Sequence, residues 1–169
     1  MKIVVLACEG NSEVELMFQL LTDNHLIFKK EDVLDRRPIH LRQPYIIVPI
    51  VSTLPTETKI TIFRIGDTQR DNFDISCFGE TRINDIRVVK ICTMPEIELL
   101  IIINEGLYEE YLKVKSKLSP KQFVKMNVTN YTSFKDYVNS HDLRSSIKEY
   151  KRIKKHKNGE GYLADLLKD

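Results

Sequence analysis

The chain has 169 residues, of which 42% are hydrophobic and 30% are charged, and its formal net charge is +2. This composition is typical of a globular protein with one buried core. No apolar run approaches the roughly 18 residues of a membrane span. A secretory signal is not expected, because no small-residue cleavage site follows the short N-terminal apolar run. The three cysteines lack CxxC spacing, which favours reduced thiols and a cytoplasmic location.

Charge is distributed unevenly along the chain. Residues 1–112 carry 12 Lys and Arg against 18 Asp and Glu, whereas residues 113–169 carry 14 against 6. An acidic body followed by a basic region fits a cation site beside a phosphate-binding surface. We therefore expect an α/β core over 1–112, with a basic helical region over 113–169 packed on it as one domain. The candidate nucleic-acid contacts in that region are Lys113, Lys115, Lys117 and Lys121. The alternative is that these lysines only solvate helix surfaces.

Three apolar runs predict strands. Residues 2–7 (KIVVLA), 59–65 (KITIFRI) and 86–92 (IRVVKIC) are short and rich in β-branched side chains, as in the buried strands of a parallel sheet. Residues 45–51 (YIIVPIV) are also apolar, but Pro49 favours an edge strand or an extended segment.

Helical signals account for much of the remaining chain. Ser12 and Glu15 match a capping box that begins a helix after the first strand, and Thr93 and Glu96 match a second. A buried helix is expected over 95–105, but the β-branched residues of this segment make a strand an alternative prediction. Helical patterns continue from Tyr108 to the end. This order of elements predicts an α/β fold with a mostly parallel sheet flanked by helices.

Acidic side chains follow each predicted strand. Glu9 follows the first strand, Asp67 follows the second, and Glu96 and Glu98 follow the third. Because neighbouring parallel strands end at the same edge of a sheet, these carboxylates are expected to converge there. Hard oxygen ligands favour Mg²⁺ or Mn²⁺ over zinc. The helix dipole offers an alternative explanation for acids at helix starts, but it does not account for Glu9 or Asp67.

Three motifs in order resemble those of Toprim domains, especially in OLD-family nucleases and RloB-like proteins. The sequence CEGNSE at 8–13 resembles the first motif, in which E-G-x-[ST]-E follows the first strand. The sequence FRIGDTQRD at 63–71 resembles the aspartate-rich second motif. The sequence TMPEIELLIIINEG at 93–106 resembles the segment that follows the next strand in RloB-like proteins. The order and spacing of the motifs hold from residue 3 to about residue 112, roughly two-thirds of the chain, and three motifs in order are more specific than any one of them.

The resemblance implies a Toprim-like fold and a Mg²⁺- or Mn²⁺-dependent nuclease acting on DNA or RNA, in a phage-defence or repair context. Glu9 and Asp67 would be catalytic, and the metal-binding set would be Glu9, Glu13, Asp67, Asp71, Glu96 and Glu98. The chain departs from the family at Gln69, which replaces the second aspartate of D-x-D, so that Asp71 would have to compensate.

This departure leaves a second function open, that of a non-catalytic Toprim-like module that binds a partner protein such as an ATPase. Assembly of the chain into a homo-oligomer is a further possibility. A nucleotide-binding domain of Rossmann type fits less well, because the first turn has one glycine where G-x-G-x-x-G needs three.

Overall fold

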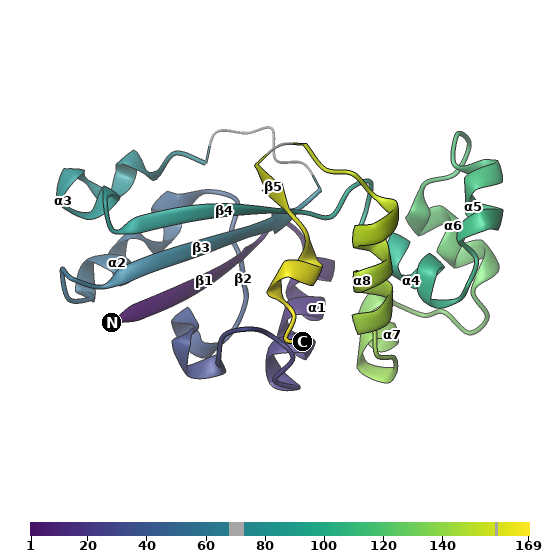
Figure 1. Cartoon of the computed structure of the whole chain (residues 1–169), viewed down its shortest axis with the longest axis horizontal. Coiled ribbons are helices and arrows are strands. Elements are labelled where there is room, and N and C mark those ends of the chain that lie inside the picture. Colours follow the sequence, from purple (N-terminus) through teal and green to yellow (C-terminus); the bar gives the residue numbers. More distant parts are fainter. Residues whose placement is uncertain (68–72, 158) are drawn as a thin grey trace.

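The fold is α/β, as predicted, in a computed structural model that describes residues 1–67, 73–157 and 159–169 (Figure 1). Within these residues the strands form one parallel sheet in the order β2-β1-β3-β4-β5. The strands are β1 (Lys2–Cys8), β2 (Ile39–His40), β3 (Lys59–Gly66), β4 (Ile86–Cys92) and β5 (Glu160–Gly161).

The three strands predicted from sequence are confirmed as neighbours in the centre of the sheet. Cys8 of β1 lies beside Ile65 of β3, and Gly66 of β3 lies beside Cys92 of β4. The carboxyl ends of β1, β3 and β4 are therefore level, and the residues that follow them start from one edge. The two outer strands were not predicted, because a two-residue strand carries no periodic signal.

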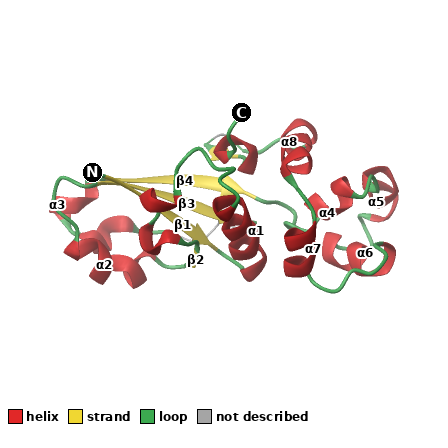
Figure 2. Ribbon diagram, turned by 90° about the horizontal axis from the view of Figure 1, so that it is seen from below, coloured by secondary structure: helices red, strands yellow, loops and turns green. Residues whose placement is uncertain are grey.

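Helices cover both faces of the sheet and extend beyond its carboxyl edge (Figures 1 and 2). The α-helices in the described residues are α1 (Asn11–Thr22), α2 (Val48–Thr53), α3 (Glu80–Ile83), α4 (Leu99–Asn104), α5 (Tyr108–Val114), α6 (Pro120–Asn127), α7 (Phe134–Ser140) and α8 (Arg144–Ile153). Short 3₁₀ helices are η1 (Lys30–Asp32), η2 (Leu34–Arg36), η3 (Pro44–Ile47), η4 (Ile75–Phe78) and η5 (Leu163–Leu166). Helices α4 to α8 gather beyond the carboxyl ends of the strands in Figure 1.

Each face of the sheet has its own hydrophobic core. On one face, Leu6 and Cys8 pack with side chains of α1, α4, α6, α7 and α8. On the other, Val5 and Ala7 pack with side chains of η3 and α2. The alternation along β1 is what a strand buried on both faces requires. Phe123, from the basic region 113–169, belongs to the first core, so that region and the strands share one interior.

Several local expectations were wrong. Residues 45–51 lie in η3 and α2 instead of a strand, because proline is well tolerated in the first turn of a helix, where Pro49 lies. The expected capping boxes do not form: α1 has Gly10 as its N-cap, and α4 begins only at Leu99, in each case without a side-chain cap bond.

The described helices include none that has the length and apolar character needed to cross a membrane.

Candidate functional site

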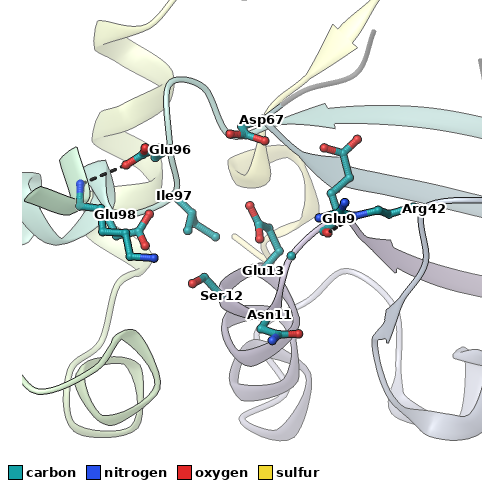
Figure 3. A pocket seen from close by; sticks show the side chains of 11 residues that line it. Glu9, Asn11, Ser12, Glu13, Arg42, Asp67, Glu96, Ile97 and Glu98 are labelled. Carbon is teal, nitrogen blue, oxygen red and sulfur yellow. Dashed lines mark hydrogen bonds between the residues drawn. The ribbon is translucent and has the colours of Figure 1, made fainter. Parts of the chain in front are cut away.

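A cavity of about 540 Å³ opens at the carboxyl edge of the sheet, and acidic side chains dominate its lining (Figure 3). The expected carboxylates that line it are Glu9, Glu13, Asp67, Glu96 and Glu98. Its other lining residues are Gly10, Asn11, Ser12, Arg42, Ile97 and Lys121. The ends of β1 and β3, the start of α1, the loop 93–98 and the start of α6 thus meet around one space.

Glu13 is held in the wall of this cavity by its neighbours. It lies in the first turn of α1 with 7% of its surface exposed, and the Thr93 hydroxyl donates a hydrogen bond of 3.3 Å to its Oε1. The other carboxylate oxygen of Glu13, Oε2, lies close to Gly10. A Cβ added to Gly10 would lie 2.7 Å from this oxygen. Burial raises the pKa of Glu13, and the carboxylates of Asp67 and Glu98 raise it further.

Glu98 reaches the cavity from the residue before α4 and is also 7% exposed. Burial raises its pKa, as do the carboxylates of Glu96 and Asp67, whereas Lys121 opposes the rise. Glu13 and Glu98 are therefore both desolvated and both repelled by Asp67. Figure 3 shows Glu13, Asp67 and Glu98 around the same space. Such mutual repulsion is relieved when a cation binds between the groups.

Glu96 has a structural partner at the rim. Its Oε2 accepts a hydrogen bond of 3.0 Å from the Lys121 backbone amide (Figure 3). That amide belongs to the first turn of α6, whose N-cap is Ser119. Glu96 thus satisfies one of the amides that a helix leaves unpaired at its start, and it ties the loop 93–98 to α6.

Glu9 is engaged in a buried ion pair that the sequence analysis missed. Its Oε1 lies 2.9 Å from Nη2 of Arg64 on the neighbouring strand β3, and Arg64 has no exposed surface. The side chain crosses Gly66, where an added Cβ would overlap it. Arg64 lies on the same face of β3 as Ile60 and Ile62, which belong to the core on the side of the sheet away from α1. The Glu9 carboxylate therefore turns toward that face, whereas Glu13 approaches from the face that α1 covers.

Cationic side chains at the rim face the acidic group. Lys121, one of the candidate nucleic-acid contacts, lines the cavity. Arg42 lines it too and was not predicted; its Nε donates a 3.1 Å hydrogen bond to the Glu9 carbonyl. The other three predicted lysines, Lys113, Lys115 and Lys117, are exposed on or just after α5 and do not line the cavity.

Asp67 follows β3, is half-buried and lines the cavity. Asp71 and Gln69, the two positions on which the departure from D-x-D depends, lie outside the described residues. Among the described residues, no three His, Cys, Asp or Glu side chains are arranged to hold one metal ion together. The donor chemistry nevertheless fits Mg²⁺, which usually binds one or two carboxylates and completes its shell with water and substrate phosphate.

The ion pair of Glu9 had a visible signal in the sequence. Arg64 stands between Phe63 and Ile65 in a strand predicted to be buried, and a buried arginine needs a carboxylate partner. Glu9 at the end of the adjacent strand was available for that role. Thr93 carried no comparable signal, because its contact with Glu13 joins residues 80 positions apart.

Comparison of the chain with protein-family models, with curated proteins and with solved structures finds no significant match. The resemblance to Toprim domains consequently rests on the three motifs and on their positions at the strand ends.

Proposed function

We propose that the protein is a divalent-metal-dependent hydrolase of phosphodiester bonds in DNA or RNA. The observation that carries the proposal is that Glu13, Asp67 and Glu98 line one cavity together with Lys121. Burial and the acidic neighbours raise the pKa values of Glu13 and Glu98. The shared motif order with Toprim nucleases supports the same reaction.

The residues divide naturally between holding a cation and moving a proton. Asp67 and Glu13 would hold Mg²⁺ or Mn²⁺, with Thr93 orienting Glu13 through its hydroxyl. When bound, the ion would polarise the phosphoryl oxygens and favour ionisation of water. Glu98 would accept the proton of the attacking water, since burial raises its pKa and so its basicity. As the new P–O bond forms, the bond to the leaving oxygen breaks, and that oxygen takes a proton from solvent.

The rim would bind the substrate phosphates. Lys121, beside Glu96, and Arg42, beside Glu9, both line the cavity, where their charges would offset those of the phosphodiester. Lysine is a compact point charge suited to a mobile phosphate, whereas arginine can bind two phosphate oxygens at once. Lys121 lies at the start of α6, which fixes its backbone at the edge of the cavity.

A second function is favoured by the ion pair between Glu9 and Arg64. A first-motif glutamate engaged by a buried arginine is less available for catalysis than a solvated one. The protein would then be a non-catalytic Toprim-like module that binds a partner protein such as an ATPase.

Nuclease assays distinguish the two functions. We expect cleavage of single-stranded DNA or RNA, or of tRNA, by wild type with Mg²⁺ or Mn²⁺ and its loss in EDTA. Asp67→Asn should reduce the rate by about 100-fold or more, since loss of a residue that only orients a metal ligand already costs about 10- to 100-fold. Glu15→Gln is the matched control, because Glu15 lies on the same helix as Glu13 and pairs with Lys135 instead of lining the cavity. Absence of cleavage on every substrate, with both metals, would favour the partner-binding module.

A further inference from the structure

Beyond the acidic cavity, the C-terminal ends of α5 and α8 each carry a lysine, Lys115 and Lys154. Lys154 is the C-cap residue of α8, and its Nζ lies over the ring of Tyr108, 5.9 Å from the centroid. Lys115 is the C-cap residue of α5. Tyr108 and Lys115 are seven positions apart and so lie on the same face of that helix. Tyr108 and Lys115 therefore bring one aromatic ring and a second ammonium group toward Lys154.

The backbone at Lys154 is fixed on both sides. Its amide donates to the Tyr150 carbonyl at 2.9 Å, and its carbonyl accepts from the Tyr162 hydroxyl at 3.0 Å. Tyr162 in turn stacks on His156, with ring centroids 3.9 Å apart. The backbone of the half-buried Lys154 is thus held by two hydrogen bonds, which fixes the point from which its side chain extends.

The two ammonium groups repel each other. Burial lowers the pKa of Lys154, and the charge of Lys115 lowers it further. Within the described residues, neither lysine takes part in an ion pair with a carboxylate. Two like charges on neighbouring segments are stabilised by an anion that binds between them.

Helix α8, which carries Lys154 at its end, contacts the loop 93–98 that lines the cavity. The Tyr150 hydroxyl of α8 donates a 2.6 Å hydrogen bond to the Met94 carbonyl of this loop. Glu96 of the same loop lines the cavity and is near enough to Tyr111 of α5 to help raise its pKa, after the larger effect of burial. One polymer could therefore contact both places if it bends over the loop. Duplex DNA is stiff over about 150 base pairs, so a flexible single strand fits this path better.

We propose that Lys115 and Lys154 form a phosphate subsite for single-stranded nucleic acid, with Tyr108 positioning Lys154. Occupation of the cavity by a neighbouring linkage of that strand rests on the proposed function, whereas phosphate binding by the two lysines does not. The subsite assigns one of the lysines expected from sequence, Lys115, to a phosphate and adds Lys154 as its partner.

Fluorescence anisotropy of labelled 12-nucleotide DNA and RNA strands, in EDTA and about 50 mM salt, tests the subsite without requiring catalysis. Lys154→Gln and Lys115→Gln should each weaken binding about five- to tenfold and reduce the slope of log K against log salt by about 0.7, as expected for one lost phosphate contact. Lys148→Gln is the control, since it removes the same charge from an exposed position of α8. Tyr108→Leu should weaken binding, and Tyr108→Phe, which keeps the ring, should restore it.

The outcomes separate this inference from the proposed function. Binding that depends on both lysines, without cleavage when Mg²⁺ or Mn²⁺ is added, would support the subsite and contradict the nuclease. Cleavage by Lys154→Gln and Lys115→Gln with unchanged KM and unchanged affinity would contradict the subsite and leave the nuclease intact. The subsite is also overturned if wild type binds neither strand, or if Lys148→Gln weakens binding as much as the two subsite variants.

Discussion

The ion pair between Glu9 and Arg64 requires a glycine at position 66 on the neighbouring strand. A buried guanidinium is stabilised by a nearby carboxylate, and removing one partner of such a pair typically costs about 3–5 kcal/mol. Glu9 reaches Arg64 only by crossing Gly66, where a Cβ would overlap its side chain. Gly66 is therefore explained by this close approach. The same pair means that Glu9→Gln tests stability as well as catalysis.

A double-mutant cycle tests this explanation. Gly66→Ala should lower the free energy of unfolding by about 1–3 kcal/mol, the usual cost of overpacking, because the new methyl displaces Glu9. In a Glu9→Ala background the same substitution should cost much less, since the side chain that it overlaps is gone. Chemical denaturation of the four proteins measures the coupling. Equal costs of Gly66→Ala in both backgrounds would show that Glu9 is not the reason for the glycine.

Glu13 and Glu98 make the stability of the metal-free protein depend on pH. Both pKa values are raised above the ordinary 4.5, so the folded state holds these protons more tightly than the unfolded state. Their contribution to stability is fully present below about pH 4.5 and is lost as pH rises through the folded pKa values. Asp142, whose pKa Arg144 lowers to about 2, acts in the opposite direction only below its ordinary 3.8.

Thermal melting in EDTA from pH 4.5 to 8 therefore tests the carboxylate cluster. The Tm of wild type should fall as pH rises through this range. Glu13→Gln should raise the Tm at pH 7.5 and flatten the dependence, because it removes a desolvated and repelled charge. Glu15→Gln should retain the wild-type slope. A Glu13→Gln profile parallel to that of wild type would contradict the repulsion at the cavity.

At the scale of elements, the sequence predicted what depends on local pattern. The three central strands have short runs rich in β-branched residues. The start of α6 has Ser119 as its N-cap and Pro120 in its first turn, a pattern typical of a helix start. The segment 45–51 was mistaken for a strand because its apolar residues fit either structure and Pro49 suits a first helical turn as well as a sheet edge. The capping boxes failed because the pattern S-x-x-E also occurs inside a helix, as at Ser12 in α1.

The N-terminus of α6 gives a test at this scale. Ser119 Oγ accepts from the Gln122 amide at 3.3 Å, and the Gln122 side chain accepts from the Ser119 amide at 3.0 Å. Ser119→Ala should lower the free energy of unfolding by about 1 kcal/mol, as for other N-caps. Ser116→Ala, at an exposed position before the helix, is the control. Equal stability of the two variants in urea denaturation would contradict the cap.

At the scale of the whole molecule, the helices after residue 112 complete the core and one wall of the cavity. Phe123, Val124 and Ile147 are at most 4% exposed and belong to the core on the α1 face. The C-terminal segment also returns to the segment that follows α1, where the Ile27 amide donates to the Leu166 carbonyl at 2.9 Å. The convergence of acids could be predicted because it follows from parallel strands with level ends. The pairing of Glu9 with Arg64 also had a signal in the sequence, but the close approach of Glu9 to Gly66 did not, because it depends on the register between β1 and β3.

A fragment of residues 1–112 should consequently fail to unfold cooperatively. Without the later helices it would expose the buried side chains of α4, and each such residue contributes about 1.5–3 kcal/mol when buried, against a total stability of only about 5–15 kcal/mol. Circular dichroism during heating measures the cooperativity, with the full chain as the control. A sharp transition in the fragment would show that residues 1–112 form an independent domain.

The central claim is that Asp67 and Glu13 bind a divalent cation at the acidic cavity, and calorimetric titration with Mn²⁺ at pH 7.5 tests it most directly. We expect saturable binding by wild type and by the control Glu15→Gln. Asp67→Asn and Glu13→Gln should each bind at least about tenfold more weakly, because loss of a residue that only orients a metal ligand already costs about 10- to 100-fold. Equal affinity in all four proteins, or no binding by wild type at millimolar Mn²⁺, would contradict the claim.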